Sequence, residues 1–265
     1  MNTNTNHTPK VQKRQGGADA VKNMALTAVL IALIALLGFT PVGMIPLGFI
    51  NISILAIPVI VGTISVGPKC GLVLGACFGG ISALSAFGIY GTPSALASAL
   101  VAASPALALV VCFVPRLLVP VAAHGVYRLA SKRKTADAKR ATPVRGAVGT
   151  LIYLALITFL LIRLDAYRLW YVDAAALLSA AGVFLLLYKK REAVALSAIA
   201  GAFTNTVFYL GLMLLSYIAM GIDSANLLAV IGGTGLIAGS AEAVAAAFVC
   251  TGVCMALSKV KKAKL

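Results

Sequence analysis

The stretch LSAIAGAFTNTVFYLGLML (residues 196–214) has the composition of a membrane-spanning helix, because it is mostly apolar and carries no charge. At about 20 residues it is long enough to cross the hydrocarbon core of a bilayer. The polar triplet Thr204-Asn205-Thr206 nevertheless lies in its middle. Lipid offers no hydrogen-bond partner, so polar groups at this depth must face protein, water or a ligand. The functional question is which of these the triplet faces.

The composition of the whole chain places this stretch in an integral membrane protein. Of the 265 residues, 61% are hydrophobic and 11% are charged, whereas a soluble domain is about half apolar and a quarter charged. The apolar runs are about 17–25 residues long, which suits transmembrane helices rather than barrel strands. No alternating strand pattern is visible. The sequence therefore predicts an all-α membrane bundle.

Most of the positive charge lies in short clusters beside the apolar runs. The net charge is +15, and the lysines and arginines gather before the first run, in residues 128–145, at 189–191 and at 259–264. This placement follows the positive-inside rule, so it favours cytoplasmic loops beside anionic lipid over nucleic-acid binding. We expect a multi-pass protein of the bacterial plasma membrane with both termini in the cytoplasm.

The order of runs and breaks predicts a six-helix core with one added helical hairpin, about eight spans in total. A disordered tail (1–20) precedes four helices (21–127), and a basic linker (128–145) leads to the extra hairpin (146–190). The last two core helices (191–258) and a basic tail (259–265) follow. The hairpin either spans the membrane or lies in its interface. Within the core we expect an outer apolar loop at 40–50, a second span at 51–66 and a fourth at 94–123, kinked by prolines. Gly71, Gly75 and Gly79 share one helix face, which predicts close helix contact.

No enzyme motif is present in the chain. There is no H-E-x-x-H, no G-x-S-x-G and no phosphate-binding G-x-x-x-x-G-K-[ST], and the five cysteines show no metal-ligand spacing. We therefore expect no catalytic residue, no metal and no cofactor, and uphill transport would need an ion gradient or a separate ATPase. Glu242 is the one clearly intramembrane carboxylate, and it either couples protons or hydrogen-bonds to a neighbouring helix or partner. Arg116 either snorkels to the interface or has a buried functional role.

The remaining polar side chains at depth predict a small-molecule pocket that opens outward. Asn205 lies near mid-membrane beside Thr204, and Tyr209 follows one helical turn outward on the same face. Three further candidates fall in the outer half: Asn51, Tyr90 and Thr234. The alternative for each residue is a hydrogen bond between helices. A separate stripe, Ala28 and Ala32 in the first span, suits close approach of another helix, either within this chain or from a partner.

Several of these motifs together resemble a known family. They are IPVIVGTISVGPKCGLVLGACFGGISAL (57–84), VPRLLVPVAAHGVYRLASK (114–132), AFTNTVFYLGLM (202–213) and the last helix with Glu242 and its basic tail. Residues 24–132 and 194–259 are similar to the substrate-binding S components of energy-coupling factor (ECF) vitamin transporters, of the branch that includes pantothenate S components. The candidate hairpin departs from the six helices of that family.

The resemblance implies a vitamin-binding subunit of an ECF-type ABC importer, with pantothenate as the first substrate. It implies a transmembrane coupling subunit and two ATPase subunits as partners, which use the ATP, and it gives Ala28 and Ala32 the role of docking on the coupling subunit. Cobalamin, a pyrimidine, folate and riboflavin are other possible ligands. The competing hypothesis is a self-contained, proton-coupled carrier that uses Glu242.

Overall fold

A computed structural model describes residues 10–40, 43–46, 51–90, 93–136, 192–221 and 225–262. Five helices contain apolar stretches long enough to cross a membrane, within α1 (Lys10–Gly38), α3 (Pro68–Ala86), α5 (Pro105–Ala136), α8 (Glu192–Ala219) and α9 (Ala225–Lys262). Two shorter helices are also present, α2 (Ala56–Ser65) and α4 (Ala95–Ala103). The prediction of an α-helical, multi-pass membrane protein is confirmed.

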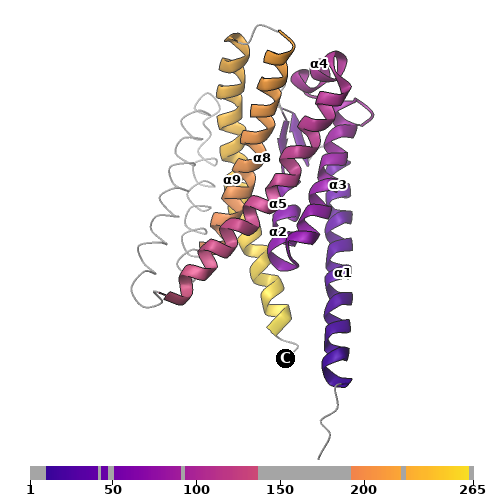
Figure 1. Ribbon diagram of the computed structural model, residues 1–265, viewed down its shortest axis with the longest axis vertical. Coiled ribbons are helices and arrows are strands. Elements are labelled where there is room, and N and C mark those ends of the chain that lie inside the picture. The colour runs from indigo at the N-terminus through magenta and orange to yellow at the C-terminus, as the bar shows by residue number, and fades with distance from the viewer. Residues whose placement is uncertain are drawn as a thin grey trace, which may run out of the picture.

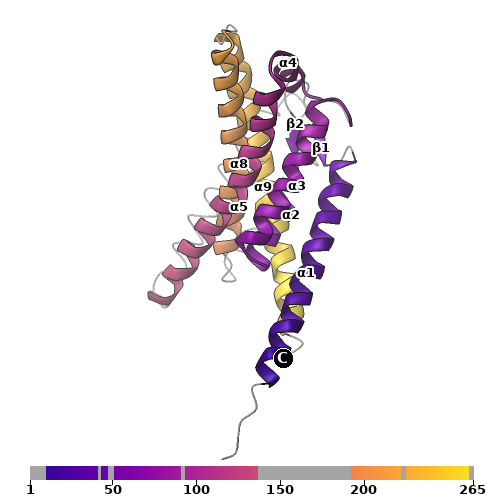
Figure 2. The ribbon, with the colours of Figure 1, turned by 45° about the vertical axis from the view of Figure 1, so that its right-hand side comes forward.

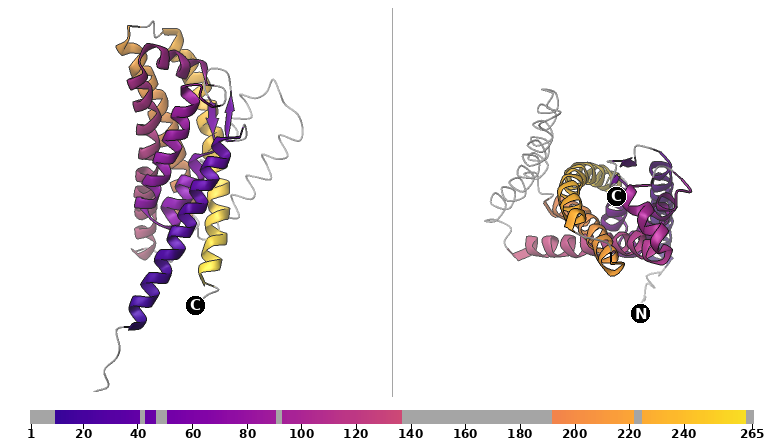
Figure 3. Two further views of the ribbon diagram at one scale, coloured as in Figure 1. Left: turned by 90° about the vertical axis from the view of Figure 1, so that its right-hand side faces the viewer. Right: turned by 90° about the horizontal axis from the view of Figure 1, so that it is seen from above.

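The helices form an elongated bundle with α5 near its centre (Figure 1). Helix α5 packs against both α3 and α8, and α8 packs against α9. Their shared core contains Leu55, Ile60, Leu74 and Phe78, all fully buried. Helix α1 stands at the edge beside α3 (Figures 2 and 3). Only 11% of its apolar stretch is buried, against 33–61% for the other four, so most of its surface faces outward.

The second predicted span is a short strand followed by a short helix. A two-stranded antiparallel ribbon pairs β1 (Met44–Pro46) with β2 (Asn51–Ser53), and α2 starts only at Ala56. The expected continuous span over 51–66 is wrong here, because residues 51–53 are strand and the helix covers only Ala56–Ser65. Pro58 explains the late start, because proline is tolerated in the first turn of a helix and breaks its interior. Non-helical backbone at membrane depth must find its hydrogen bonds inside the protein.

The fourth predicted span is broken into two helices. Helix α4 ends before Ser104, which is extended (φ −156°, ψ 99°) as expected for a residue preceding proline. The Ser104 hydroxyl then accepts a hydrogen bond from the Leu107 amide at 3.4 Å and caps the start of α5. Helix α5 runs on to Ala136, so its last two turns lie within the segment expected to be a linker. The membrane-crossing stretch is accordingly Pro105–Ser131.

The glycine row of α3 makes the close contacts that its spacing predicts. A Cβ atom on Gly71 would lie 2.7 Å from Pro120 Cβ, and one on Gly75 would lie 2.6 Å from the carbonyl oxygen of Arg116. A Cβ on Gly79 would meet the Phe113 ring at 2.8 Å. These three neighbours belong to α5, and Gly71 also meets the Thr63 hydroxyl of α2. The glycines therefore allow α3 and α5 to approach closely, most of all at Gly75, which meets backbone atoms.

Helix α1 begins earlier than expected, at Lys10, inside the segment 1–20 that was expected to be a disordered tail. The predicted hairpin 146–190 lies outside the described residues. The start of α1 and the end of α9 lie at the same end of the bundle, and α4 lies at the opposite end (Figure 1).

Candidate functional site

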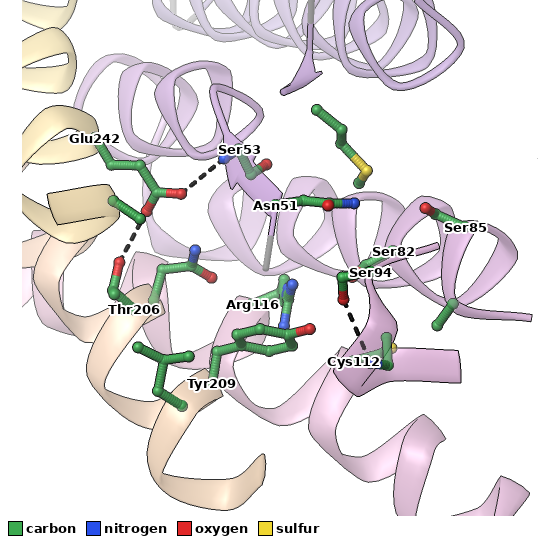
Figure 4. Close-up of a pocket in the computed structure, with 16 residues that line it drawn as sticks. Asn51, Ser53, Ser82, Ser85, Ser94, Cys112, Arg116, Thr206, Tyr209 and Glu242 are labelled. Carbon is green, nitrogen blue, oxygen red and sulfur yellow. Dashed lines mark hydrogen bonds between the residues drawn. The ribbon is translucent and has the colours of Figure 1, made fainter. Parts of the chain in front are cut away.

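A polar cavity lies between the β1–β2 ribbon and helices α3, α4, α5, α8 and α9. Met44, Asn51 and Ser53 of the ribbon form one wall. Two groups of polar side chains face each other across Arg116 and Tyr209 (Figure 4). One group contains Glu242, Thr206 and Ser53, and the other contains Ser82, Ser85, Ser94 and Cys112. The cavity is thus lined from six different elements, with charged groups at its centre and on one side.

The space inside this cavity is small. About 50 Å³ is open to the centre of a water molecule, whereas the volume free of atoms is about 600 Å³ and includes open solvent. One water centre needs roughly 10–15 Å³, so the cavity holds a few waters. A larger ligand must extend into the mouth or displace a wall.

Arg116 is held in the cavity by its own helix. Pro115 has no N–H, so it leaves the carbonyl oxygen of Val111, four residues earlier, without its helical donor. The Arg116 guanidinium fills that gap, because Nη1 donates a hydrogen bond to Val111 O at 3.0 Å. Arg116 is only 5% exposed. Pro115 therefore frees an acceptor, and the neighbouring Arg116 supplies the donor that bonds to it.

Two aromatic rings and one packed carbonyl fix the rest of Arg116. Its Cζ atom lies 4.4 Å from the centroid of the Tyr209 ring and 5.2 Å from that of Phe78, within the range of cation–π attraction. Pro120 frees the Arg116 carbonyl in the same way as Pro115 frees Val111, and Gly75 of α3 packs against that carbonyl. The Nε atom is buried without a hydrogen-bond partner. Arg116 is thus a fixed, buried cation with an unused donor.

Glu242 links three elements at one side of the cavity. Its Oε1 accepts a hydrogen bond from the backbone N–H of Ser53 in β2 at 2.7 Å, and its Oε2 accepts one from the Thr206 hydroxyl in α8 at 2.8 Å (Figure 4). The carboxylate itself belongs to α9 and is 7% exposed. This is the hydrogen-bonding alternative that the sequence offered for Glu242.

Asn205 brings a second unused polar atom to the cavity. Its side chain is 4% exposed and its Oδ1 is buried without a hydrogen-bond partner. A buried polar atom without a partner costs about 1–3 kcal/mol. Tyr209, one turn further along α8, lines the same cavity with its ring over Arg116. Arg116 Nε is thus a buried donor and Asn205 Oδ1 a buried acceptor, both without a partner, in residues that line the cavity.

The structure gathers only part of the residue set predicted from the sequence. Asn205, Tyr209 and Asn51 line the cavity, and their contact with a ligand stays a prediction. Thr204 instead donates to the Ala200 carbonyl of its own helix at 2.7 Å. The Tyr90 hydroxyl donates to the backbone carbonyl of Phe39, and the Tyr90 ring packs edge-on against the Phe39 ring with centroids 4.8 Å apart. Thr234 belongs to α9, and its side chain lies outside the described residues.

Arg116, Thr206 and Ser53 line the cavity without having been assigned to it from the sequence. Of the two alternatives for Arg116, burial in the bundle is the one observed. Its adjacent Pro115 and Pro120 are the signal in the sequence, because each proline leaves a carbonyl that something else must satisfy. Thr206 belongs to the original polar triplet, and only its contact with Glu242 separates it from Thr204.

The alanine stripe lies away from this cavity. Ala28 and Ala32 are both exposed on α1, and α1 is the least buried of the membrane-crossing helices. In the part of the chain that is described, no other helix covers this stripe. Its role as a contact surface for a partner stays a prediction.

Fold and site together describe one class of membrane protein: a helical bundle around a polar cavity with unpartnered hydrogen-bonding atoms. The family model described as "ECF transporter, substrate-specific component" matches residues 22–254, so the chain belongs to this family of transport subunits and is not an enzyme. Members of the family work with an ECF module of transmembrane and ATPase subunits. No curated protein matches the chain.

Proposed function

We propose that this chain captures a small carboxylate-bearing vitamin, pantothenate first, and delivers it through an ECF module. The observation that carries the proposal is Arg116, a buried guanidinium inside the cavity with its Nε unpartnered. A planar guanidinium binds a carboxylate through parallel N–H···O bonds, and such charge-assisted bonds are the strong ones. Pantothenate has a carboxylate for Arg116 and hydroxyl and amide donors for Asn205.

The wider polar wall suits the rest of such a ligand. Ser82 and Ser85 of α3 and Ser94 before α4 line the cavity on the far side of Arg116 from Glu242 (Figure 4). Hydroxyl groups both donate and accept, so this wall can pair with the polar groups of a short flexible acid. Since the cavity admits only a few waters, a ligand of this size must extend into the open mouth or displace a wall, and the short ribbon is the smallest wall.

Charge and shape support a direction of capture. Two of the basic clusters lie at the ends of the chain, and the start of α1 and the end of α9 share one end of the bundle (Figure 1). The positive-inside rule favours a cytoplasmic position for that end. The ribbon and α4, which border the cavity, then face outward, where a vitamin is collected.

Delivery depends on partners, because the chain has no phosphate-binding loop of its own. The exposed stripe of Ala28 and Ala32 on α1 allows another helix to approach closely. We assign it to the transmembrane coupling subunit. The hydrogen bonds of Glu242 weaken the alternative of a self-contained proton-coupled carrier, because both of its carboxylate oxygens are already used within the bundle.

Uptake with and without the ECF module tests the proposal. The chain is expressed in a pantothenate-auxotrophic host, alone and with the three module subunits, and uptake of labelled pantothenate is measured. We expect uptake only with the complete module, and none for Arg116→Gln, which keeps a polar side chain that donates hydrogen bonds and removes the charge. Arg116→Lys keeps the charge without the planar fork and should retain only weak uptake. Uptake by the chain alone that an uncoupler abolishes would favour the proton-coupled carrier instead.

Mass spectrometry of small molecules that copurify with the protein tests the substrate separately. Cobalamin, a pyrimidine, folate or riboflavin in place of pantothenate would reject the substrate and leave the transport role intact. Loss of the copurified ligand in Arg116→Gln would connect it to the cavity.

A further inference from the structure

Strand β2 has backbone N–H groups that point away from β1 and cannot donate hydrogen bonds to it. In an antiparallel pair, successive N–H groups point alternately toward the partner strand and away from it. The Ile54 N–H points toward the first strand and donates to Gly43 O at 3.1 Å. The neighbouring Ser53 N–H therefore points away from it, into the bundle. Ser53 is 6% exposed, so this N–H cannot be satisfied by bulk water and needs an acceptor from another element.

Glu242 is that acceptor. Its Oε1 lies 2.7 Å from Ser53 N, and its Oε2 lies 2.8 Å from the Thr206 hydroxyl. We infer that Glu242 is a positioning residue: its carboxylate joins β2 to α8 and thereby holds the β1–β2 ribbon in place as a wall of the cavity. The inference rests on the proposed function only for what the cavity binds.

The ribbon matters to the cavity because of what it carries. Met44 and Asn51 line the cavity from the two strands, and the register pairs Met44 with Ser53 and Pro46 with Asn51. Two strands of three residues form a ribbon that is not stable by itself. The ribbon follows Gly43, whose N–H donates to Thr40 O at 3.2 Å, and leads directly into α2. Glu242 adds a hydrogen bond from α9, so its loss leaves β2 with one anchor fewer.

The geometry requires two acceptor or donor atoms on one side chain and does not require a negative charge. A glutamine at this position can accept from the Ser53 N–H through its oxygen and donate to the Thr206 hydroxyl through its nitrogen. Thr206 can then donate to Ala202 O, which lies 3.3 Å away. Glu242→Gln is thus the conservative variant that keeps the connection, and Glu242→Ala is the variant that removes it.

Hydrogen exchange of the ribbon in the ligand-free protein tests the inference. Amide exchange in residues 43–46 and 51–55 is followed by mass spectrometry in nanodiscs. We expect Glu242→Ala to raise exchange there by about tenfold or more, the effect of losing a buried hydrogen bond to a charged group. Glu242→Gln should stay within about threefold of the unaltered protein.

Two further variants keep the test decisive. Thr206→Val preserves side-chain shape and removes one of the two bonds, so it should raise ribbon exchange by about threefold or more even if Glu242→Ala fails to fold. Thr251→Val is the matched control in α9, because the buried Thr251 hydroxyl bonds only its own helix, at Ala247 O. Its ribbon exchange should not change.

Unchanged ribbon exchange in Glu242→Ala would overturn the inference. So would equal acceleration in Glu242→Gln, which would mean that the charge acts and not the hydrogen-bond geometry, or equal acceleration in Thr251→Val. The result is separate from the proposed function, because no ligand is present. Labelled pantothenate then provides a second readout: its dissociation should be faster in Glu242→Ala by about the same factor. A protein that binds no pantothenate would reject the substrate and leave the exchange result as it stands.

Discussion

Gly75 and Gly80 of α3 provide a matched pair of substitutions that tests how Arg116 is held in place. A Cβ atom on Gly75 would lie 2.6 Å from the carbonyl oxygen of Arg116 and 3.3 Å from its carbonyl carbon. A Cβ atom on Gly80, in the same helix, would meet nothing within 4 Å. Alanine at either position gains the same helix propensity, about 1 kcal/mol over glycine. The difference between the two variants therefore isolates the contact with Arg116.

The size of that difference follows from the contact distance. For ordinary contact at about 3.4 Å the carbonyl oxygen would have to withdraw by about 0.8 Å. The oxygen belongs to the backbone of a packed helix and cannot rotate away. Forcing an extra methyl group into such a site costs about 1–3 kcal/mol. We expect the free energy of unfolding of Gly75→Ala to be lower than that of Gly80→Ala by this amount.

Ligand affinity should change along with stability. A shift of α5 moves the Arg116 guanidinium relative to Asn205 and Tyr209 on α8. We expect Gly75→Ala to bind pantothenate about tenfold more weakly, which is about 1.4 kcal/mol, and Gly80→Ala to bind it normally. Thermal unfolding in detergent and isothermal titration calorimetry measure the two effects. Equal stability and equal affinity of the two variants would refute the argument that the glycine contact positions Arg116.

Three other substitutions probe separate parts of the molecule. Asn205→Ala should weaken ligand binding by about 1–3 kcal/mol if its unpartnered Oδ1 accepts a hydrogen bond from the ligand; unchanged affinity in calorimetry would remove Asn205 from the site. Ala28→Trp should abolish copurification of the chain with the ECF module and leave ligand binding by the isolated protein intact, whereas loss of both would make the stripe a packing surface. Tyr217→Phe removes the bond from the Tyr217 hydroxyl to Leu96 O, 2.9 Å long, and should lower the free energy of unfolding by about 0.5–1.5 kcal/mol with unchanged affinity; a larger loss of affinity than of stability would contradict a purely structural bond.

The sequence indicated part of the cavity lining in α8, where the predicted span is a single helix. Asn205 and Tyr209 belong to a single uninterrupted helix, and one helical turn of spacing was enough to bring them to the same cavity. Arg116 was predicted inside the span 94–123, toward its cytoplasmic end, because these residues form one apolar run. The break at Ser104 moves the crossing stretch to Pro105–Ser131 and brings Arg116 nearer to its middle.

The contacts of Ser53 and Thr206 could not be derived from local sequence. Whether 51–55 is strand or helix depends on where Pro58 falls in the first turn of α2, and the partner of the Ser53 N–H comes from a residue far along the chain. Thr204 and Thr206 are equivalent by composition and differ only in the face they present. That face is decided by the packing of α8 against α9, which is a property of the whole bundle.

The hydrogen bond that holds Arg116 has a consequence for the release of a bound anion. Its hydrogen bond is to Val111 of α5 itself, whereas the Tyr209 ring that covers it belongs to α8. If α8 moves away from α5, the Arg116 guanidinium keeps its position on α5 and loses only the Tyr209 ring that covers it. Water then reaches the ion pair, and the attraction between charges about 4 Å apart falls from about 4 kcal/mol near a protein surface to about 1 kcal/mol in bulk water. Unloading by hydration needs no movement of the arginine at all.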